Sequence, residues 1–366
     1  MAKCWSFTAS RDTLYRYSFN SSGLKSSLTN LGDGTTIHCW IPKTHKPDKP
    51  NLLLIHGFGA NAMWQWSHLI GLFTSKFNLY VPDLLFFGES FTTRLDRSES
   101  FQAQCLGRVM MEVYKVRTLS LVGLSYGGFV GYSLAEQFEG LVERVVVCCA
   151  GVCLEEKDLK QGLFRVSDLD EAVSILLPQT PEKMKVLVRM SFVKPAKSLP
   201  SCFLRDFIDG AINRNMVESL TVSLFRVGYS ITTVALDKLY KKSGTYAKEF
   251  QFLIRFVCGQ VMCTEYVQEK RELLAAVLKD RKLSDLPRIT QPTLIIWGDQ
   301  DQIFPLELGH RLKSHIGENA ELVIIKDAGH AVNMEKPKRF YKHLKDFLIN
   351  YIPNPPTTKD ERDKIE

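Results

Sequence analysis

Short apolar runs bounded by glycine, proline or aspartate recur along the chain and alternate with segments of helical spacing. Most of these runs lack a two-residue alternation, which is typical of parallel strands that are covered on both faces. The runs that predict strands are 51–56, 77–82, 120–123, 145–149, 293–297 and 321–325. Helical spacing is found between them, for example at 62–74, 102–113 and 127–138. Strands that alternate with helices predict a doubly wound α/β sheet.

Two further β-like runs, 24–31 and 35–41, flank the turn Gly32-Asp33-Gly34. This arrangement predicts a β-hairpin ahead of the parallel strands. The whole pattern therefore predicts an α/β fold with a mostly parallel sheet of eight strands and helices on both faces.

The alternation stops near Leu154 and resumes near Pro292. The sequence between these points is helix-like at 167–177, 181–192, 202–212, 216–227, 251–261 and 269–278. A sheet cannot contain so long an excursion unless the excursion packs as its own layer. We therefore expect an N-terminal arm (1–23), a core formed by 24–153 and 291–352, an inserted helical cap (154–290) and a disordered tail (353–366).

The composition, with 45% hydrophobic and 24% charged residues in 366, is that of an ordinary globular protein. No apolar run approaches the roughly 20 residues that cross a bilayer, and the first residues lack the apolar core of a secretory leader. The net charge of +7 is a small basic excess, which is compatible with binding to an anionic partner such as a membrane face. Acidic residues are interspersed among the basic ones, which argues against nucleic-acid binding. We expect an intracellular, cytoplasmic protein that is not secreted. Three questions stay open: whether the first residues form a basic organelle-targeting arm, whether the cap contacts a membrane peripherally, and what the oligomeric state is.

The nine cysteines are odd in number and mostly lie inside apolar segments. This distribution is typical of free, buried thiols in a reducing compartment. Their spacing matches no zinc-ligand pattern, so we expect no metal site.

One apolar segment, LSLVGLSYGGFVGY, is interrupted by a single serine, Ser125. The stretch GLSYG lies where a buried strand is followed by a helix, which matches the G-x-S-x-G turn of a nucleophilic serine. Glycine is needed at Gly123 and Gly127, because side chains there would collide with the crossing strand and helix. The sequence therefore predicts that Ser125 is a nucleophile.

A serine hydroxyl needs a base, and that base needs an acid to orient it. Polar residues follow two late strands, in GDQDQIFP and AGHAVNMEKP. We predict Asp301 as the acid and His330 as the base, with Asp299 as the rival acid. A turn carboxylate and a surface histidine are the structural alternatives for these two residues.

Backbone amides are also needed to stabilise the negative charge that develops on the attacked carbonyl oxygen. The segment HGFG ends a strand next to the expected serine turn, so we assign the amides of Phe58 and Tyr126 to this oxyanion hole. A plain tight turn is the alternative for this segment. His56 and Asp83 are expected to have structural roles.

These motifs together resemble the α/β-hydrolase superfamily. The sequence is similar to its monoacylglycerol-lipase-like branch of capped serine hydrolases, especially plant members. The matching stretches are HGFGA (56–60), DLLFFGES (83–90), GLSYGG (123–128), WGDQDQIFP (297–305) and DAGHAVNMEKP (327–337). The resemblance implies hydrolysis of carboxylic esters through an acyl-enzyme, with no metal or organic cofactor.

The resemblance leaves the substrate open, because one fold supports many reactions. Lipid-like acyl groups, as in monoacylglycerol, are favoured over small polar or aromatic esters, because the expected cap is rich in Phe, Leu, Val and Met. The superfamily's epoxide hydrolases and dehalogenases carry aspartate where this chain has Ser125, which disfavours their reactions. A ligand receptor on a hydrolase scaffold, carbon–carbon hydrolysis, perhydrolysis and acyl transfer stay open as alternatives.

Overall fold

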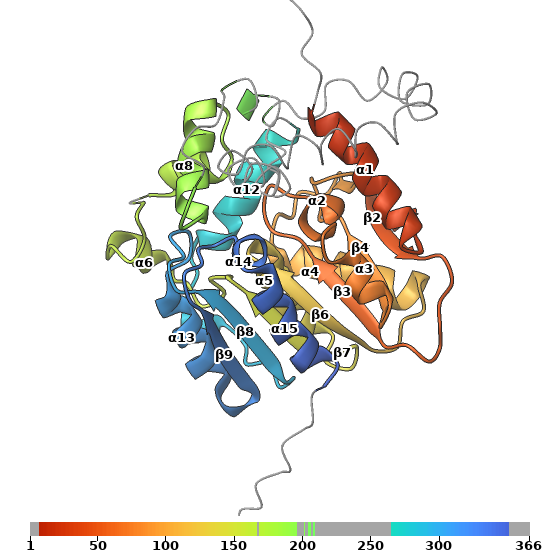
Figure 1. The fold of residues 1–366 in the computed structure, drawn as a ribbon. Coiled ribbons are helices and arrows are strands. Elements are labelled where there is room, and N and C mark those ends of the chain that lie inside the picture. The colour runs from red at the N-terminus through yellow and green to blue at the C-terminus, as the bar shows by residue number, and fades with distance from the viewer. Residues whose placement is uncertain are drawn as a thin grey trace, which may run out of the picture.

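The structure of the chain, a computed structural model, describes residues 7–166, 168–195 and 265–350, and positions 201, 204, 205 and 208 (Figure 1). Nine strands form one sheet, in which eight follow the order β1-β2-β4-β3-β6-β7-β8-β9. The ninth, β5, is a two-residue strand that pairs with β2. The prediction of a mostly parallel α/β sheet is therefore confirmed.

The six inner and late strands pair in parallel, as their apolar sequences predict. Their bounds are β3 (Asn51–Ile55), β4 (Asn78–Pro82), β6 (Leu119–Leu124), β7 (Val142–Cys148), β8 (Thr293–Gly298) and β9 (Ala320–Ile325). Because parallel strands end at the same edge, the loops after β3, β6, β8 and β9 meet there. This edge carries the candidate site.

The predicted hairpin is present as β1 (Leu24–Asn30) and β2 (Thr35–Pro42), which pair antiparallel. β2 also pairs antiparallel with β4 and with β5 (Phe91–Thr92). The sequence pattern missed β5, because two residues are too few to show a period.

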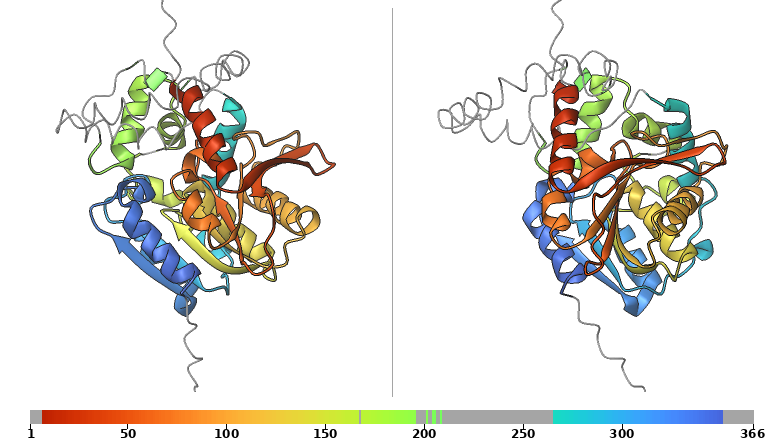
Figure 2. Two further views of the ribbon diagram at one scale, coloured as in Figure 1. Left: turned by 45° about the vertical axis from the view of Figure 1, so that its right-hand side comes forward. Right: turned by 90° about the vertical axis from the view of Figure 1, so that its right-hand side faces the viewer.

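Helices cover both faces of the sheet (Figure 2). Their bounds are α2 (Ala62–Trp66), α3 (Ile70–Thr74), α4 (Glu99–Arg108), α5 (Tyr126–Gln137), α13 (Leu306–Ile316), α14 (Val332–Glu335) and α15 (Pro337–Leu348). A π-helical turn (Val109–Val113) extends α4, and two short 3-10 turns lie at Leu283–Asp285 and Gly317–Asn319. The expected single helix over 62–74 is divided into α2 and α3. None of the helices in the described ranges is long and apolar enough to cross a membrane.

Four helices of the segment expected to form a cap lie over the carboxyl edge of the sheet (Figure 1). They are α6 (Glu156–Lys160), α7 (Leu169–Leu176), α8 (Pro181–Ser191) and α12 (Val267–Leu278). Arg311 of α13 attaches this segment to the core, because its guanidinium donates to both carboxylate oxygens of Asp158, at 2.6 and 3.1 Å. The helices expected at 216–227 and 251–261, most of the one at 202–212, and the tail lie outside the described residues.

The N-terminal arm contains a helix that the sequence pattern did not indicate, α1 (Phe7–Ser21). It lies on the β1–β2 side of the sheet (Figure 2). Two aromatic contacts hold it there, one to α2 and one to β2. The ring of Tyr15 meets Trp64 edge-on at 5.0 Å, and Phe19 lies 5.1 Å from Trp40. Two anchors one turn apart in an otherwise polar stretch are too few to give a clear helical period.

Candidate active site

Ser125 occupies the sharp turn between β6 and α5. Its backbone has φ 53° and ψ −123°, a conformation that residues other than glycine rarely adopt. A Cβ on Gly123 would lie 2.3 Å from the carbonyl oxygen of Gly127, and a Cβ on Gly127 would lie 2.4 Å from that of His56. Only glycine fits at these two positions, for the steric reason expected from the sequence.

The structure brings Ser125, His330 and Asp301 into one hydrogen-bonded chain. His330 Nε2 lies 2.9 Å from Ser125 Oγ, and His330 Nδ1 lies 2.9 Å from Asp301 Oδ2. A carboxylate can only accept, so Nδ1–H donates to Asp301, which leaves Nε2 free to accept the serine proton. The three side chains therefore have the geometry in which a histidine can deprotonate a serine.

Asp301 is fixed in place by its own turn. Its side chain is 0% exposed, and its second oxygen, Oδ1, accepts the amides of Ile303 at 2.8 Å and Phe304 at 2.9 Å. The rival acid, Asp299, accepts the amide of Ala328 at 3.2 Å instead. This geometry favours Asp301 over Asp299 as the partner of His330.

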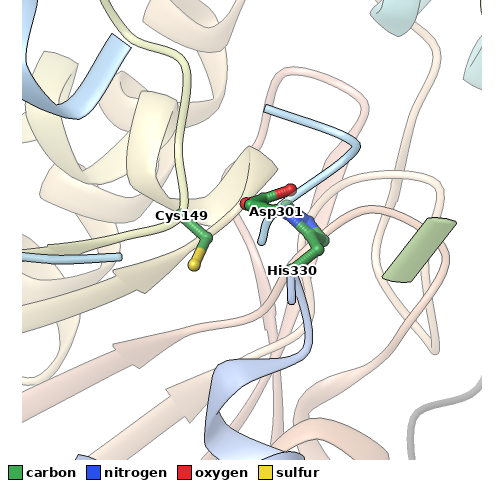
Figure 3. A group of neighbouring side chains, drawn as sticks. All are labelled: Cys149, Asp301 and His330. Carbon is green, nitrogen blue, oxygen red and sulfur yellow. Dashed lines mark hydrogen bonds and ion pairs between the residues drawn. The ribbon is translucent and has the colours of Figure 1, made fainter. Parts of the chain in front are cut away.

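Cys149 lies beside this acid and base (Figure 3). Ligand-type atoms of Cys149, Asp301 and His330 all lie within 4.8 Å of one another, so a metal ion is an alternative to consider. Burial raises the pKa of the Cys149 thiol well above its usual value, and a neutral thiol is a poor metal ligand. Both ring nitrogens of His330 already have partners in Ser125 and Asp301. The donor set therefore fits a hydrogen-bonded chain better than a metal site.

The two residues predicted to stabilise an oxyanion both lie next to Ser125. Tyr126 is the first residue of α5, so its amide has no carbonyl one turn earlier within the helix. Phe58 follows Gly57, and a Cβ on Gly57 would lie only 3.2 Å from Ser125 Cβ. The rings of Phe58 and Tyr126 are 6.0 Å apart. The loop after β3 and the start of α5 therefore border the same hydroxyl.

A cavity opens over Ser125 and His330, and we call it the serine cavity. Its core wall includes Phe58, and its other wall is formed by apolar side chains of α7 and α8. These side chains are Leu176, Met184, Leu187 and Val188.

A second cavity, which we call the apolar chamber, lies among α6, α7, α12 and the turn after Asp301. Apart from Arg165 and Gln302, its lining is entirely apolar, and it includes Ala172 of α7 and Phe304. It shares two lining residues, Leu176 and Ile303, with the serine cavity. The two cavities are therefore neighbours separated by a thin apolar wall.

The comparisons with known proteins identify the family of this fold. The family model for the alpha/beta hydrolase fold matches residues 50–337. The chain belongs to the α/β-hydrolase family. This confirms the fold and family predicted from the sequence.

Relatives of this α/β-hydrolase include lipases and esterases. Monoacylglycerol lipase ABHD6 of Homo sapiens is 25% identical over 323 residues, covering 85% of this chain and 79% of that protein. The structure of an esterase from Exiguobacterium antarcticum superposes with a TM-score of 0.60 at 18% identity, covering 88% of this chain and 99% of that chain. The esterase structure shows the shared fold. The family match and the lipase relatives confirm the prediction of an ester hydrolase.

The fold alone does not select the substrate. A 2-hydroxy-6-oxo-6-phenylhexa-2,4-dienoate hydrolase from Rhodococcus sp. strain RHA1 has a TM-score of 0.58 at 17% identity, covering 89% of this chain and 99% of that chain. Its name and that of the esterase specify different substrates on one fold. The substrate of this α/β-hydrolase must therefore be argued from its own cavities.

His56, which precedes Ser125 in the chain, has the structural role expected from the sequence. Its Nε2 accepts the amide of Leu84 at 2.9 Å, and its Nδ1 donates to the carbonyl oxygen of Gly57 at 2.8 Å. Burial lowers the pKa of His56, so the ring stays neutral. The imidazole thus fixes the loop that carries Phe58.

Sequence reasoning missed the supporting role of Glu335. Its Oε2 accepts the amide of Gly329 at 2.6 Å, and its Oε1 accepts the amide of Val193 at 3.0 Å. Glu335 therefore ties the turn that carries His330 to the end of α8. The signal in the sequence was weak, because an acidic residue after a turn is common and Val193 is far away in the chain.

Proposed function

We propose that this α/β-hydrolase cleaves carboxylic esters of lipid-like acyl groups, such as monoacylglycerols, with Ser125, His330 and Asp301 as its catalytic residues. The observation that carries the proposal is the hydrogen-bonded chain from Ser125 Oγ through His330 to Asp301. It lies at the sheet edge where the loops after β6, β8 and β9 meet.

The reaction proceeds through an acyl-enzyme. His330 takes the hydroxyl proton as Ser125 attacks the ester carbonyl, and the amides of Phe58 and Tyr126 stabilise the oxyanion. The protonated imidazole, held by Asp301, then gives its proton to the leaving alcohol. Water activated by His330 releases the acid by the reverse sequence.

The apolar chamber supports an acyl group with a long hydrocarbon chain. It adjoins the serine cavity across Leu176 and Ile303, and an apolar lining favours methylene groups over polar ones. The segment 154–290 would thus serve as a cap that binds the acyl chain, while the core carries out the chemistry.

The first test is a panel of carboxylic esters that includes p-nitrophenyl esters and monoacylglycerols. Ser125→Ala should lower kcat/KM by at least about 10³-fold, because the other residues cannot replace the nucleophile. Ser133→Ala, which changes a second serine on α5, is the matched control and should retain activity. Turnover of these esters by Ser125→Ala at the wild-type rate would contradict the proposal.

A further inference from the structure

Asn333 lies in α14, three residues after His330, and its side chain has no hydrogen-bond partner. The residue is 1% exposed, and both its Nδ2 and its Oδ1 are unpaired. In the described ranges, five buried side-chain polar atoms lack a partner, and Asn333 supplies two of them. Buried polar groups are normally hydrogen-bonded, since leaving one unpaired is unfavourable. An unpaired amide at this place therefore needs an explanation.

The location of Asn333 supplies that explanation. Asn333 lines the serine cavity together with Ser125 and His330. The other unpaired atoms belong to Trp40, Trp66 and Gln291, and none of these residues lines this cavity. The unpaired amide therefore belongs to a residue that borders the space a bound ester would occupy.

We propose that the side-chain amide of Asn333 hydrogen-bonds a hydroxyl group on the alcohol part of the substrate, so that the enzyme selects acyl esters of polyols. This inference rests on the proposed function. An amide offers one donor group and one acceptor group, and a hydroxyl can pair with both kinds. An acceptor-only group, such as a second ester carbonyl, would leave Oδ1 unpaired.

The alcohol part is the expected partner because the acyl part has its own place. Asn333 does not line the apolar chamber, where the hydrocarbon chain is proposed to bind. The alcohol part of the ester would therefore bind at Asn333 in the serine cavity, and the acyl part would bind in the apolar chamber. Asn333 is then a specificity-determining residue rather than one that takes part in proton transfer.

The test compares two soluble esters that differ only in two hydroxyl groups, 1-hexanoylglycerol and propyl hexanoate. The ratio of their kcat/KM values measures recognition of the hydroxyls, because the acyl group is the same. The wild type should prefer the glycerol ester by about tenfold or more, since the propyl ester leaves the amide unpaired. Asn333→Leu, which has the same branched shape without polar atoms, should bring the ratio close to one.

Two further measurements separate recognition from packing. Asn333→Leu should also raise the melting temperature, because it removes two unpaired buried polar atoms. Met334→Leu alters the same cavity wall without removing a hydrogen-bonding group, so the rates for both esters should change together and the ratio should stay at its wild-type value.

The outcomes distinguish this inference from the proposed function. If Ser125-dependent turnover of both esters is found but the wild type shows no preference, or Asn333→Leu keeps the preference, the role of Asn333 is wrong and the proposed function stands. If neither ester is hydrolysed, or Ser125→Ala retains the rate, the proposed function itself is wrong. If Asn333→Leu fails to fold, Asn333→Ala takes its place, and a ratio that stays at the wild-type value in that variant shows that the role of Asn333 is wrong.

Discussion

Glu335 is the residue through which the turn carrying His330 can be tested. Replacing it with glutamine turns one acceptor oxygen into a donor that faces a backbone amide of Gly329 or Val193. The turn should loosen and His330 should move away from Ser125. We therefore expect Glu335→Gln to lower kcat/KM by about ten- to a hundredfold and the free energy of unfolding by about 1–3 kcal/mol.

Steady-state kinetics with a soluble ester and urea unfolding measure the two effects of Glu335→Gln. Glu318→Gln changes an exposed carboxylate in the same C-terminal part of the chain and is the matched control. Wild-type kinetics in Glu335→Gln would show that the contact does not position His330.

The contrast between these residues shows what a sequence can reveal at this scale. The convergence of Ser125, Asp301 and His330 could be predicted, because each follows a strand in a short and recognisable motif. Asn333 and Glu335 lie in the same motif as His330, yet their roles could not be predicted. Those roles depend on burial and on partners such as Val193, which only the folded chain brings near.

At the scale of elements, α7 lines the apolar chamber, and a larger side chain on this helix would occupy part of the chamber. Ala172 lines this chamber but not the serine cavity. Ala172→Phe should shorten the acyl chain that the enzyme accepts. Each methylene excluded from an apolar site weakens binding by about fourfold, so turnover of dodecanoyl esters should fall by at least about tenfold relative to butanoyl esters.

A chain-length series of p-nitrophenyl esters measures this change in Ala172→Phe. Glu171→Phe places the same ring on the exposed side of α7 and should keep the wild-type profile. A parallel loss for butanoyl and dodecanoyl esters in Ala172→Phe would argue for a general distortion and against binding of the chain in this chamber.

The six parallel strands lie within three residues of their predicted bounds. β3, β4, β6 and β8 are almost fully buried and therefore have unbroken apolar sequences. β7 and β9 include exposed positions, and β7 begins three residues before its predicted start, where Glu143 and Arg144 interrupt the apolar run. Tertiary contacts decide the remaining elements. α1 depends on Tyr15 and Phe19 finding aromatic partners, β5 on pairing with β2, and the break between α2 and α3 on how the chain turns over the sheet.

At the scale of the whole molecule, His38 and Asp83 join several elements near the hairpin. His38 Nδ1 lies 2.8 Å from Asp83 Oδ2, and Asp83 Oδ1 accepts the amide of Ala62 at the start of α2 at 2.8 Å. The backbone amide of Glu89 donates to Asp83 Oδ2 at 3.2 Å, and the carboxylate of Glu89 accepts from Arg16 of α1 at 2.6 Å. The pair therefore links β2, the loop after β4, α2 and, through Glu89, the N-terminal helix.

This pair also contacts a serine, since Ser26 Oγ lies 2.9 Å from His38 Nε2. The contacts repeat the Ser–His–Asp order of the candidate active site, but the setting differs. Ser26 lies in the middle of β1, opposite Trp40 in a regular antiparallel ladder. It therefore lacks the strained turn and helix start that make Ser125 a candidate nucleophile, and its contacts indicate a structural role.

The His38–Asp83 pair should make the stability of the molecule depend on pH. Burial by itself would lower the pKa of His38, but the charge and hydrogen bond of Asp83 outweigh it and raise the pKa above 6.5. Burial would likewise raise the pKa of Asp83, but His38 outweighs it and lowers the pKa below 3.8. His38 therefore contributes fully to the free energy of unfolding below pH 6.5, and this contribution is lost as the pH rises through the pKa of His38 in the folded protein. Asp83 contributes fully above pH 3.8, and its contribution is lost as the pH falls through the pKa of Asp83 in the folded protein.

His38→Gln should therefore lower the free energy of unfolding by about 3–5 kcal/mol at pH 6, because it leaves the buried Asp83 carboxylate without its charged partner. The free energy of unfolding of His38→Gln should also fall less steeply above pH 6.5, because the variant lacks the imidazole that loses its proton there. Urea unfolding at several pH values measures both effects, with the exposed His310→Gln as the matched control. If the two variants share one pH profile, the charge on His38 does not stabilise the fold, and the neutral hydrogen bonds of the pair must hold the hairpin to α2.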